Sequence, residues 1–424
     1  SSSAQVSQIW TDYNTFWTSS SSSINPVKPN TAHNLLAFRW NNGTTTNNYS
    51  TAVNNQKLTD FGVTFISTKF RGLPINSVPL TGTSSYFVGL GALVDGLATT
   101  VDNGSTNPFS PLTNGLQKAS FLTKGVQGLD LGSCLTNIPA GSPVRFNLSS
   151  NGITLSNIGD GVPDILVSQI AQPTGTTDSF RFVNSVGATV GNAVNVTLNN
   201  NTLYPIVGNW NVDFYNNDST QSNGTFVNTS REMRFFAVDL TTFGITAGNY
   251  TQAVALIYTP GGDSDPAFLA FNEPSLGIAT RLTVTAQPTT SACDGTMATP
   301  FTVQLQDRVG LPVLQAGITI TASMESGPGA LLGTLTAVTN ASGIATFSNI
   351  SFEVGGNHTI RFSNSSLDPA ITANIAAATG CADNIWTGNG TNNNWNNTAN
   401  WQTAVIPNAN NNVTIPAGRP RYPV

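Results

Sequence analysis

The sequence has few charged side chains and few of the residues that carry enzyme chemistry. Only 9% of its 424 residues are charged, against about a quarter in typical soluble domains. Lys+Arg number 16 and Asp+Glu number 21, so the net charge is −5 and no basic patch for nucleic acid is evident. The sequence also lacks an apolar run long enough to span a bilayer. We therefore expect neither a nucleic-acid-binding domain nor a transmembrane segment in it.

The scarcity of catalytic residue types argues against an enzyme. His33 and His358 are the only histidines, and the G-x-S-x-G nucleophile motif is absent. Zinc sites need clustered His or Cys, and sandwich-fold glycosidases need paired carboxylates. The glutamates lie far apart, at Glu232, Glu273, Glu325 and Glu353. We expect that the protein is not an enzyme, although distant residues can still meet in a fold.

Short runs of strand-forming residues occupy almost the whole sequence. Val, Ile, Thr and Phe recur at 63–66, 144–148, 234–238, 318–321 and 358–362, bounded by Gly, Asn, Asp and Pro. Helix is expected only at residues 6–17, where apolar residues can share one face, and near 241–246. The sequence therefore predicts an all-β protein in which sheets pack on sheets.

The pattern of turns and strands divides the chain into three parts. Residues 1–276 show no internal repeat and predict one large, jelly-roll-like N-terminal β-sandwich, with a split near Gly128 as the alternative. Residues 277–379 contain about seven strand patterns at the spacing of an immunoglobulin-like (Ig-like) sandwich. Residues 380–424 are rich in Asn and Trp and predict the truncated start of a repetitive β region, without a core of its own.

Motifs in all three parts resemble those of secreted bacterial surface proteins. V-Q-L-Q-D-R-V-G-L-P-V (303–313), T-N-A-S-G-I-A-T-F (339–347) and N-H-T-I-R-F (357–362) resemble the Ig-like domains of invasins and intimins. The segment 157–166 and the W-T-G, N-W and V-T-I-P-A-G motifs of 386–418 resemble surface proteins that Bacteroidota secrete through the type IX system. The resemblance implies an extracellular, cell-surface protein with the Ig-like domain as a rigid spacer, and it implies no catalysis.

Two pairs of aspartates beside glycine turns are candidates for binding calcium, the one cofactor expected. Asp160 and Asp164 form the first pair, and Asp263 and Asp265 form the second. Calcium takes roughly six to eight oxygen ligands from carboxylates and carbonyls. However, Ile158 stands where similar calcium loops carry an acid, and aspartates also cap turns through bonds to the backbone. Both interpretations remain open.

Aromatic residues in the first part suggest a carbohydrate site. Trp210, Asp213 and Tyr215 lie close together in a segment rich in Asn, and lectin sites combine an aromatic platform with such polar groups. Packing in the core explains the same aromatic residues equally well.

Two of the three cysteines bracket the predicted Ig-like part. Because the first and last strands of such a sandwich end at the same pole, Cys293 and Cys381 are predicted to form a disulfide, worth about 4 kcal/mol. The alternative is that both are unpaired small hydrophobic residues. Cys134 has no evident partner and is expected to be buried.

These features together predict a secreted surface protein that acts by binding. The leading hypothesis is an adhesin whose partners are glycans or other surface components. The alternative is a structural subunit of an extracellular fibre or surface layer, whose partners are copies of itself.

Overall fold

The computed structural model of the chain describes residues 5–19, 26–27, 33–79, 87–91, 112, 114–171, 175–216, 229–262, 264–292, 297–378, 381–408 and 411–424. Strands account for 42% of the chain and helices for 10%, which confirms the prediction of an all-β protein. Within the described residues, no helix is long and apolar enough to cross a membrane.

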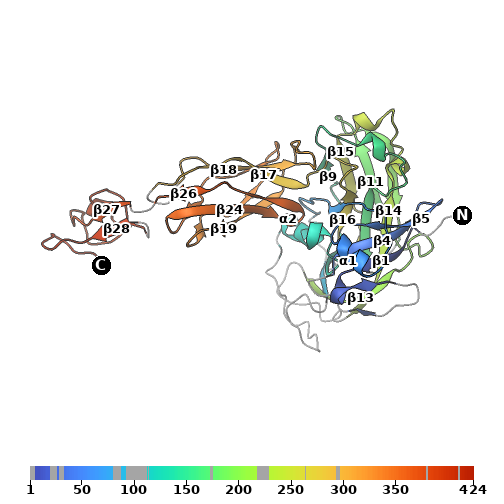
Figure 1. Cartoon of the computed structure of the whole chain (residues 1–424), viewed down its shortest axis with the longest axis horizontal. Helices are drawn as coiled ribbons and strands as arrows, with labels where there is room; N and C mark the ends of the chain where they lie inside the picture. Colours follow the sequence, from blue (N-terminus) through green and yellow to red (C-terminus); the bar gives the residue numbers. More distant parts are fainter. Residues whose placement is uncertain are drawn as a thin grey trace. The chain divides into compact units, whose positions relative to one another are not determined.

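The chain folds into two compact units (Figure 1). Unit 1 comprises residues 1–281, 305–318 and 365–368, and unit 2 comprises residues 282–304, 319–364 and 369–424. Three short segments of the predicted Ig-like part, 277–281, 305–318 and 365–368, therefore belong to unit 1. The division into three parts at 276/277 and 379/380 stays a prediction.

The described residues of unit 1 form three mainly antiparallel sheets. The first has the order β2-β1-β4-β5 (Trp17–Thr18, Val6–Thr11, Leu35–Asn41 and Thr46–Ser50). The second has the order β6-β16-β10-β14-β13-β7-β8 (Phe70–Gly72, Leu269–Asn272, Ile165–Ile170, Thr229–Val238, Gly208–Asn216, Phe87–Gly91 and Ser133–Thr136), with β3 (Pro26–Val27) parallel to β13. The third has the order β12-β11-β15-β9 (Thr189–Val196, Asp178–Val183, Ala255–Thr259 and Val144–Asn147).

The second sheet is the middle layer because both of its faces are apolar. Successive side chains of a strand point to opposite faces. On β10, Ile165 and Val167 join the core shared with the third sheet, whereas Leu166 and Ile170 join the core shared with the first. The apolar residues of β14 alternate in the same way. The N-terminal sandwich therefore has three layers of sheet.

Two local expectations differ from the structure. Residues 6–17, expected to be helical, form β1, the short 3-10 helix η1 (Tyr13–Thr15) and the start of β2. β1 pairs with β4, with Ile9 opposite Phe38, and this pairing overrides the helical spacing of the apolar residues. In 63–66, only Ile66 makes a bridge, to Tyr49.

The expected short helix near 241–246 is present as η5 (Leu240–Phe243). The remaining helices are α1 (Asn55–Asp60), α2 (Gly115–Ala119), η2 (Ser120–Leu122), η3 (Val126–Gly128), η4 (Leu155–Asn157), η6 (Tyr250–Gln252) and η7 (Thr398–Asn400). Cys134 on β8 is buried, as expected.

Most strands after residue 280 lie in one sheet with two facing halves. Its order is β21-β19-β24-β25-β17-β18-β22 (Thr336–Val338, Thr319–Ser326, Gly356–Asn364, Leu367–Ile371, Arg281–Ala286, Phe301–Gln306 and Ile344–Phe347). β26 (Ile375–Ala377) pairs with β24, and β20 (Leu331–Leu332) pairs with β23 (Ser351–Phe352). Phe362 on β24 contacts Phe301 on β18 and Phe347 on β22, at ring-centroid distances of 5.8 and 4.9 Å. The two halves thus share an aromatic core, as in a sandwich.

The segment from 381 onward encloses a small tryptophan core, contrary to the sequence-based expectation. Its strands β27 (Cys381–Ile385) and β28 (Asn411–Thr414) are parallel. Trp401 packs edge-on against Trp386 and Trp395, with ring centroids 4.9 and 4.7 Å away. The buried Asn400 side chain accepts a hydrogen bond from the N–H of Gly390 (2.7 Å) and donates to two backbone carbonyls. Large aromatic rings let this short segment bury apolar surface.

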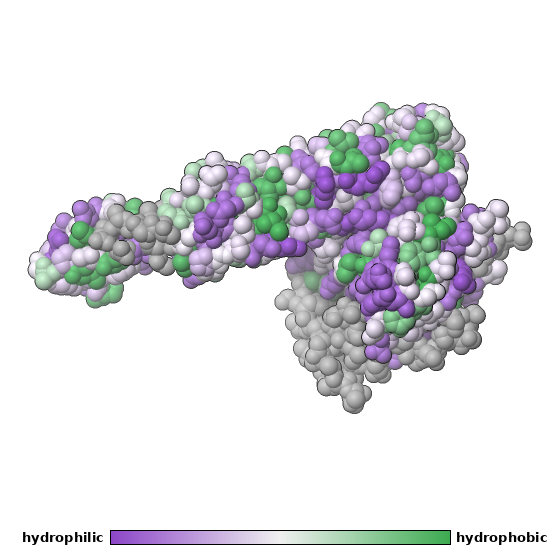
Figure 2. Space-filling view, viewed as in Figure 1, coloured by the Kyte–Doolittle hydropathy of each residue, from purple (hydrophilic) through white to green (hydrophobic). Residues whose placement is uncertain are grey.

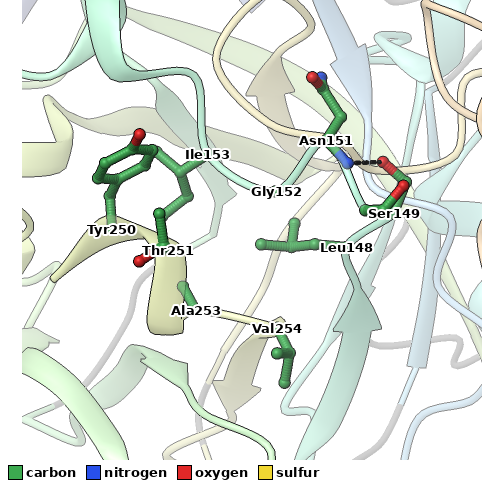
Figure 3. Close-up of a pocket in the computed structure, with 10 residues that line it drawn as sticks. Leu148, Ser149, Asn151, Gly152, Ile153, Tyr250, Thr251, Ala253 and Val254 are labelled. Carbon is green, nitrogen blue, oxygen red and sulfur yellow. Dashed lines mark hydrogen bonds between the residues drawn. The ribbon is translucent and has the colours of Figure 1, made fainter.

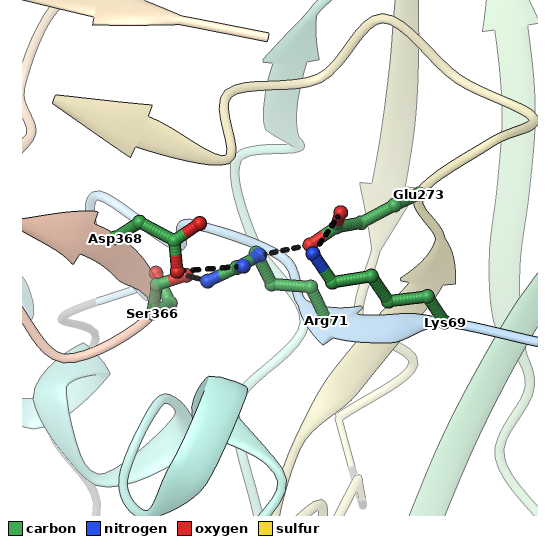
Figure 4. Close-up of polar contacts among 5 residues, drawn as sticks. All are labelled: Lys69, Arg71, Glu273, Ser366 and Asp368. Carbon is green, nitrogen blue, oxygen red and sulfur yellow. Dashed lines mark hydrogen bonds and ion pairs between the residues drawn. The ribbon is translucent and has the colours of Figure 1, made fainter. Parts of the chain in front are cut away.

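A buried ionic network ties segment 365–368 to the strands of unit 1 (Figure 4). Arg71 on β6 is 2% exposed. Its Nε donates to Glu273 Oε1 at 2.5 Å, one terminal nitrogen donates to the carbonyl of Ser366 at 2.9 Å, and the other donates to Asp368 Oδ1 at 2.9 Å. Lys69 Nζ lies 3.0 Å from the second oxygen of Glu273. A buried guanidinium is stable here because charged and carbonyl partners surround it.

Candidate functional site

Two adjoining hollows lie in unit 1, with volumes of about 340 and 400 Å³, a size suited to small-molecule ligands. The first is lined by residues 148–153, Tyr250, Thr251, Ala253 and Val254. Figure 3 shows Tyr250 on one side of it and Ser149 on the other. The second hollow shares residues 148–150 and Val254, and adds Arg145, Asn147, Pro312 and Leu314.

The loop 148–153, between the two hollows, is held by hydrogen bonds to Gly277 and Asp307. Ser149 N–H donates to the carbonyl of Gly277 (2.7 Å), and Gly277 N–H donates to that of Gly152 (2.8 Å). The hydroxyl of Ser149 donates to Asp307 Oδ2 at 2.7 Å. A Cβ at position 277 would lie 2.5 Å from Ser149 Oγ, so a larger residue there would displace that hydroxyl. The hollows are therefore preformed.

The lining of the first hollow is neutral and mixes hydroxyl, amide and aromatic groups. Tyr250 begins η6, which is held by the bond from Tyr250 N–H to the carbonyl of Thr246 (3.1 Å), and its half-buried ring packs against the core. Ser150 and Thr251 are exposed, and Asn151 is half-buried. The lining residues of this hollow offer hydrogen bonds and the face of an aromatic ring.

The second hollow has one charged lining residue. Arg145 is exposed, and its Nε donates to Asn147 Oδ1 at 2.6 Å. Asn147 Nδ2 in turn donates to the carbonyl of Leu314 at 2.5 Å. The exposed Leu314 and Pro312 add an apolar wall.

In the structure, both aspartates of the first predicted calcium pair accept hydrogen bonds from protein groups. Asp160 Oδ1 accepts from the N–H of Val162 at 2.8 Å, two residues ahead. Asp164 is fully buried, accepts from Leu240 N–H (2.8 Å) and accepts a hydroxyl bond from Ser275. These donors direct hydrogens at the oxygens that a cation would use.

The second pair is only partly described. Asp265 is buried and accepts from the N–H of Asn137 (2.7 Å) and from Gln169 Nε2 (2.9 Å), whereas Asp263 lies outside the described residues. Within the described part of the chain, no group of three or more His, Cys, Asp or Glu is placed to hold a metal ion. Calcium binding stays a prediction.

Burial of Asp164 predicts a pH-dependent stability. Burial raises the pKa of Asp164 well above its usual range, and it also raises the pKa of Asp130. The folded protein therefore keeps protons that the unfolded chain releases above a pH of about 4. The free energy of unfolding should fall as the pH rises from there through the raised pKa values. We expect urea midpoints that decline from pH 5 to pH 8.

The variant Asp164→Asn should show a shallower decline, because it lacks one of these protons. The exposed Asp60→Asn is the matched control and should keep the slope of the unchanged protein. Identical slopes in all three proteins would contradict the role of Asp164.

The residues predicted to bind a glycan lie in the core. Trp210 and Tyr215 are fully buried and Asp213 is 1% exposed. The ring of Trp210 lies 5.1 Å from that of Trp17 and 5.5 Å from that of His33. In this structure their placement corresponds to the core-packing alternative and presents no open aromatic platform.

The remaining sequence-based site residues are placed as follows. His33 is fully buried, with Nε2 3.5 Å from Asp130 Oδ1, so it is not available at a surface. His358 is buried, and its Nε2 lies 2.9 Å from the carbonyl of Val354. Cys293 and the side chain of Cys381 lie outside the described residues, so their disulfide stays a prediction.

The two hollows have no clear signature in the sequence. The loop 148–153 and Tyr250 are about a hundred residues apart in the sequence. Both lie in segments rich in Ser, Asn, Gly and Thr, a composition that is common in turns. The only local signal was the combination of a tyrosine with such turn residues at 248–251.

Comparisons with known proteins give distant structural similarities. No protein-family model matches the chain, and no curated protein matches it. A tetra-tandem repeat in the extending region of a large adhesion protein is similar with a TM-score of 0.21 and 13% identity, over 54% of this chain and 48% of that one. A beta-1,2-glucanase from Parabacteroides distasonis is similar with a TM-score of 0.20 and 12% identity, over 61% of this chain and 31% of that one. At these TM-scores neither similarity assigns a function.

Proposed function

We propose that the protein is a secreted cell-surface protein that binds neutral glycans through the two hollows of unit 1. The observation that carries this proposal is the preformed, uncharged first hollow, where Tyr250 lies among exposed hydroxyls and an amide. Sugars present hydroxyls together with apolar C–H faces, and such ligands fit an aromatic ring flanked by neutral polar groups.

The surface composition supports an extracellular binding role. With 9% charged residues, the exposed face carries mostly neutral polar side chains. Figure 2 shows hydrophobic residues in small groups separated by hydrophilic ones on the visible face. A scattered pattern of this kind does not indicate one large apolar surface for obligate assembly.

A fibre or surface-layer subunit is the second candidate function. Low charge favours it, because charged side chains are a usual defence against strand-to-strand assembly. The edge of β5 disfavours it, because Ser50 N–H and the carbonyl of Asn48 are already bonded to Ile66, at 3.0 and 2.8 Å. An edge occupied in this way cannot template a strand from another copy.

A glycan array followed by titration tests the first proposal. We expect saturable binding to neutral oligosaccharides, and Tyr250→Ala should weaken it about tenfold, equivalent to roughly 1.4 kcal/mol of lost ring contact. The matched control is Tyr422→Ala, which removes a half-exposed tyrosine of unit 2 and should leave the affinity unchanged. If no glycan binds saturably and sedimentation shows self-assembly as the concentration rises, the adhesin proposal is wrong and the fibre-subunit proposal is favoured.

A further inference from the structure

The second hollow of unit 1 carries a positive charge in its wall. Arg145, on β9, is exposed and lines this hollow. The other described residues of the lining are neutral, and among them Pro312 and Leu314 supply apolar surface. Binding of a neutral sugar makes no use of this charge. The geometry around Arg145 therefore bears on a further property of the ligand.

The side chain of Arg145 is held at its Nε end. Nε donates to Asn147 Oδ1 at 2.6 Å, and Asn147 Nδ2 donates to the carbonyl of Leu314 at 2.5 Å. The amide of Asn147 is thus fixed through both its oxygen and its nitrogen. Because Arg145 is already oriented by this amide, it loses less side-chain entropy on binding a ligand than a free arginine would.

The backbone that carries Arg145 is held as well. Gln315 Nε2 donates to the carbonyl of Arg145 at 2.9 Å, and Gln315 Oε1 accepts the N–H of Asn147 at 2.7 Å. Gln315 is only 5% exposed, so water competes little for these bonds. Its own N–H donates to the carbonyl of Val313, whose N–H donates to that of Leu305, both at 3.0 Å. The guanidinium therefore projects from a rigid base.

The bond to Asn147 uses Nε and leaves the two terminal nitrogens of the guanidinium for a ligand. Among the residues that the structure describes, no carboxylate forms an ion pair with Arg145, and its one side-chain bond is that from Nε. The carboxylate of Asp307 is fully buried and already accepts the N–H groups of Val309 and Leu311 and the hydroxyl of Ser149. Two N–H groups of a guanidinium match the two oxygens of a carboxylate.

We propose that the second hollow binds the carboxylate of an acidic sugar unit, such as a uronic acid, through the terminal nitrogens of Arg145. The two hollows share residues 148–150 and Val254, so one oligosaccharide can place a neutral unit in the first and the acidic unit in the second. A sugar fits better than an acidic peptide because the first hollow offers an aromatic ring beside hydroxyl and amide groups. This inference rests on the proposed glycan binding and adds the class of sugar.

Titration with two oligosaccharides of equal length tests the inference. One is neutral, and the other carries a single glucuronic acid in place of a glucose unit. At low salt the acidic oligosaccharide should bind about tenfold more tightly, because charge-assisted bonds are stronger than neutral ones. The preference should shrink at high salt, since ions screen an exposed charge.

The variant Arg145→Gln should abolish this preference and leave the affinity for the neutral oligosaccharide within about twofold of its original value. Arg308→Gln is the matched control, because Arg308 is exposed on segment 305–318 and is not among the residues that line the hollow. It removes the same charge from the same unit and should keep the preference. Circular dichroism of both variants checks that they are folded.

The outcomes separate this inference from the proposed function. Equal affinity of the unchanged protein for the two oligosaccharides would overturn the acidic unit alone, whereas binding of neither would overturn glycan binding as well. An equal loss of preference in Arg145→Gln and Arg308→Gln would show that overall charge causes it and would refute the role of Arg145. A glutamate-containing peptide that binds as tightly as the acidic oligosaccharide, and only with Arg145 present, would replace the sugar with an acidic peptide.

Discussion

Replacing Arg71 by leucine is expected to lower the free energy of unfolding of unit 1 by about 3–5 kcal/mol. The change removes the guanidinium and leaves the buried Glu273, which is 3% exposed, with only the half-exposed Lys69 as a charged partner. It also removes both bonds to segment 365–368. A carboxylate left underpaired away from water is costly. Urea denaturation followed by tryptophan fluorescence measures the loss.

Arg361→Leu is the matched control for Arg71. Arg361 pairs with Glu325 at 3.5 Å, and both side chains are more than a third exposed, so water and salt screen the pair and its loss should cost less than about 1 kcal/mol. The double variant Arg71→Leu/Glu273→Leu should cost less than the sum of the two single changes, because the second removes the charge that the first leaves underpaired. Equal losses for Arg71→Leu and Arg361→Leu would show that the network contributes no more than a surface pair.

Replacing Trp210 by alanine should cost about 3–5 kcal/mol of stability, because it empties a large volume in the core. The ring is fully buried on β13 and contacts those of Tyr13 and Trp17, with centroids 5.7 and 5.1 Å away. The expected result is a lower melting temperature and altered near-ultraviolet circular dichroism. Trp210→Phe, which retains part of the ring volume, should lose less.

The same variant separates a core residue from a ligand platform. If Trp210 belongs to the core, any loss of glycan binding will follow the loss of folded protein. If it bound a glycan directly, Trp210→Ala would keep the melting temperature of the unchanged protein and lose affinity. The variant Tyr250→Ala should lose less stability than Trp210→Ala, because its ring is only partly buried against the core, and its loss of affinity should exceed any loss of folded protein.

The candidate site was much harder to predict than the class of fold. Alternating Val, Ile, Thr and Phe predicted strands such as 144–148 and 234–238, because alternation is a local property of the backbone. By contrast, aromatic residues have the same appearance in a core and in a binding platform, and only the fold shows that Trp210 is buried. The aspartates at 160 and 164 adjoin turns in either interpretation, and only the fold shows which N–H and hydroxyl groups bond to them.

Composition and local patterns are enough to predict that the chain is all-β, that its surface is nearly neutral and that strand patterns continue through 277–379. These properties follow from the composition and from the alternation of apolar and polar residues, which depends only on neighbours in the sequence. The fold was needed to show that β1 is a strand, that Tyr250 meets the loop 148–153, and that Arg71 and Gln315 bond to residues far away in the chain. Contacts of this kind depend on which strands pair and on how segments 305–318 and 365–368 join unit 1, and no local pattern encodes that long-range pairing.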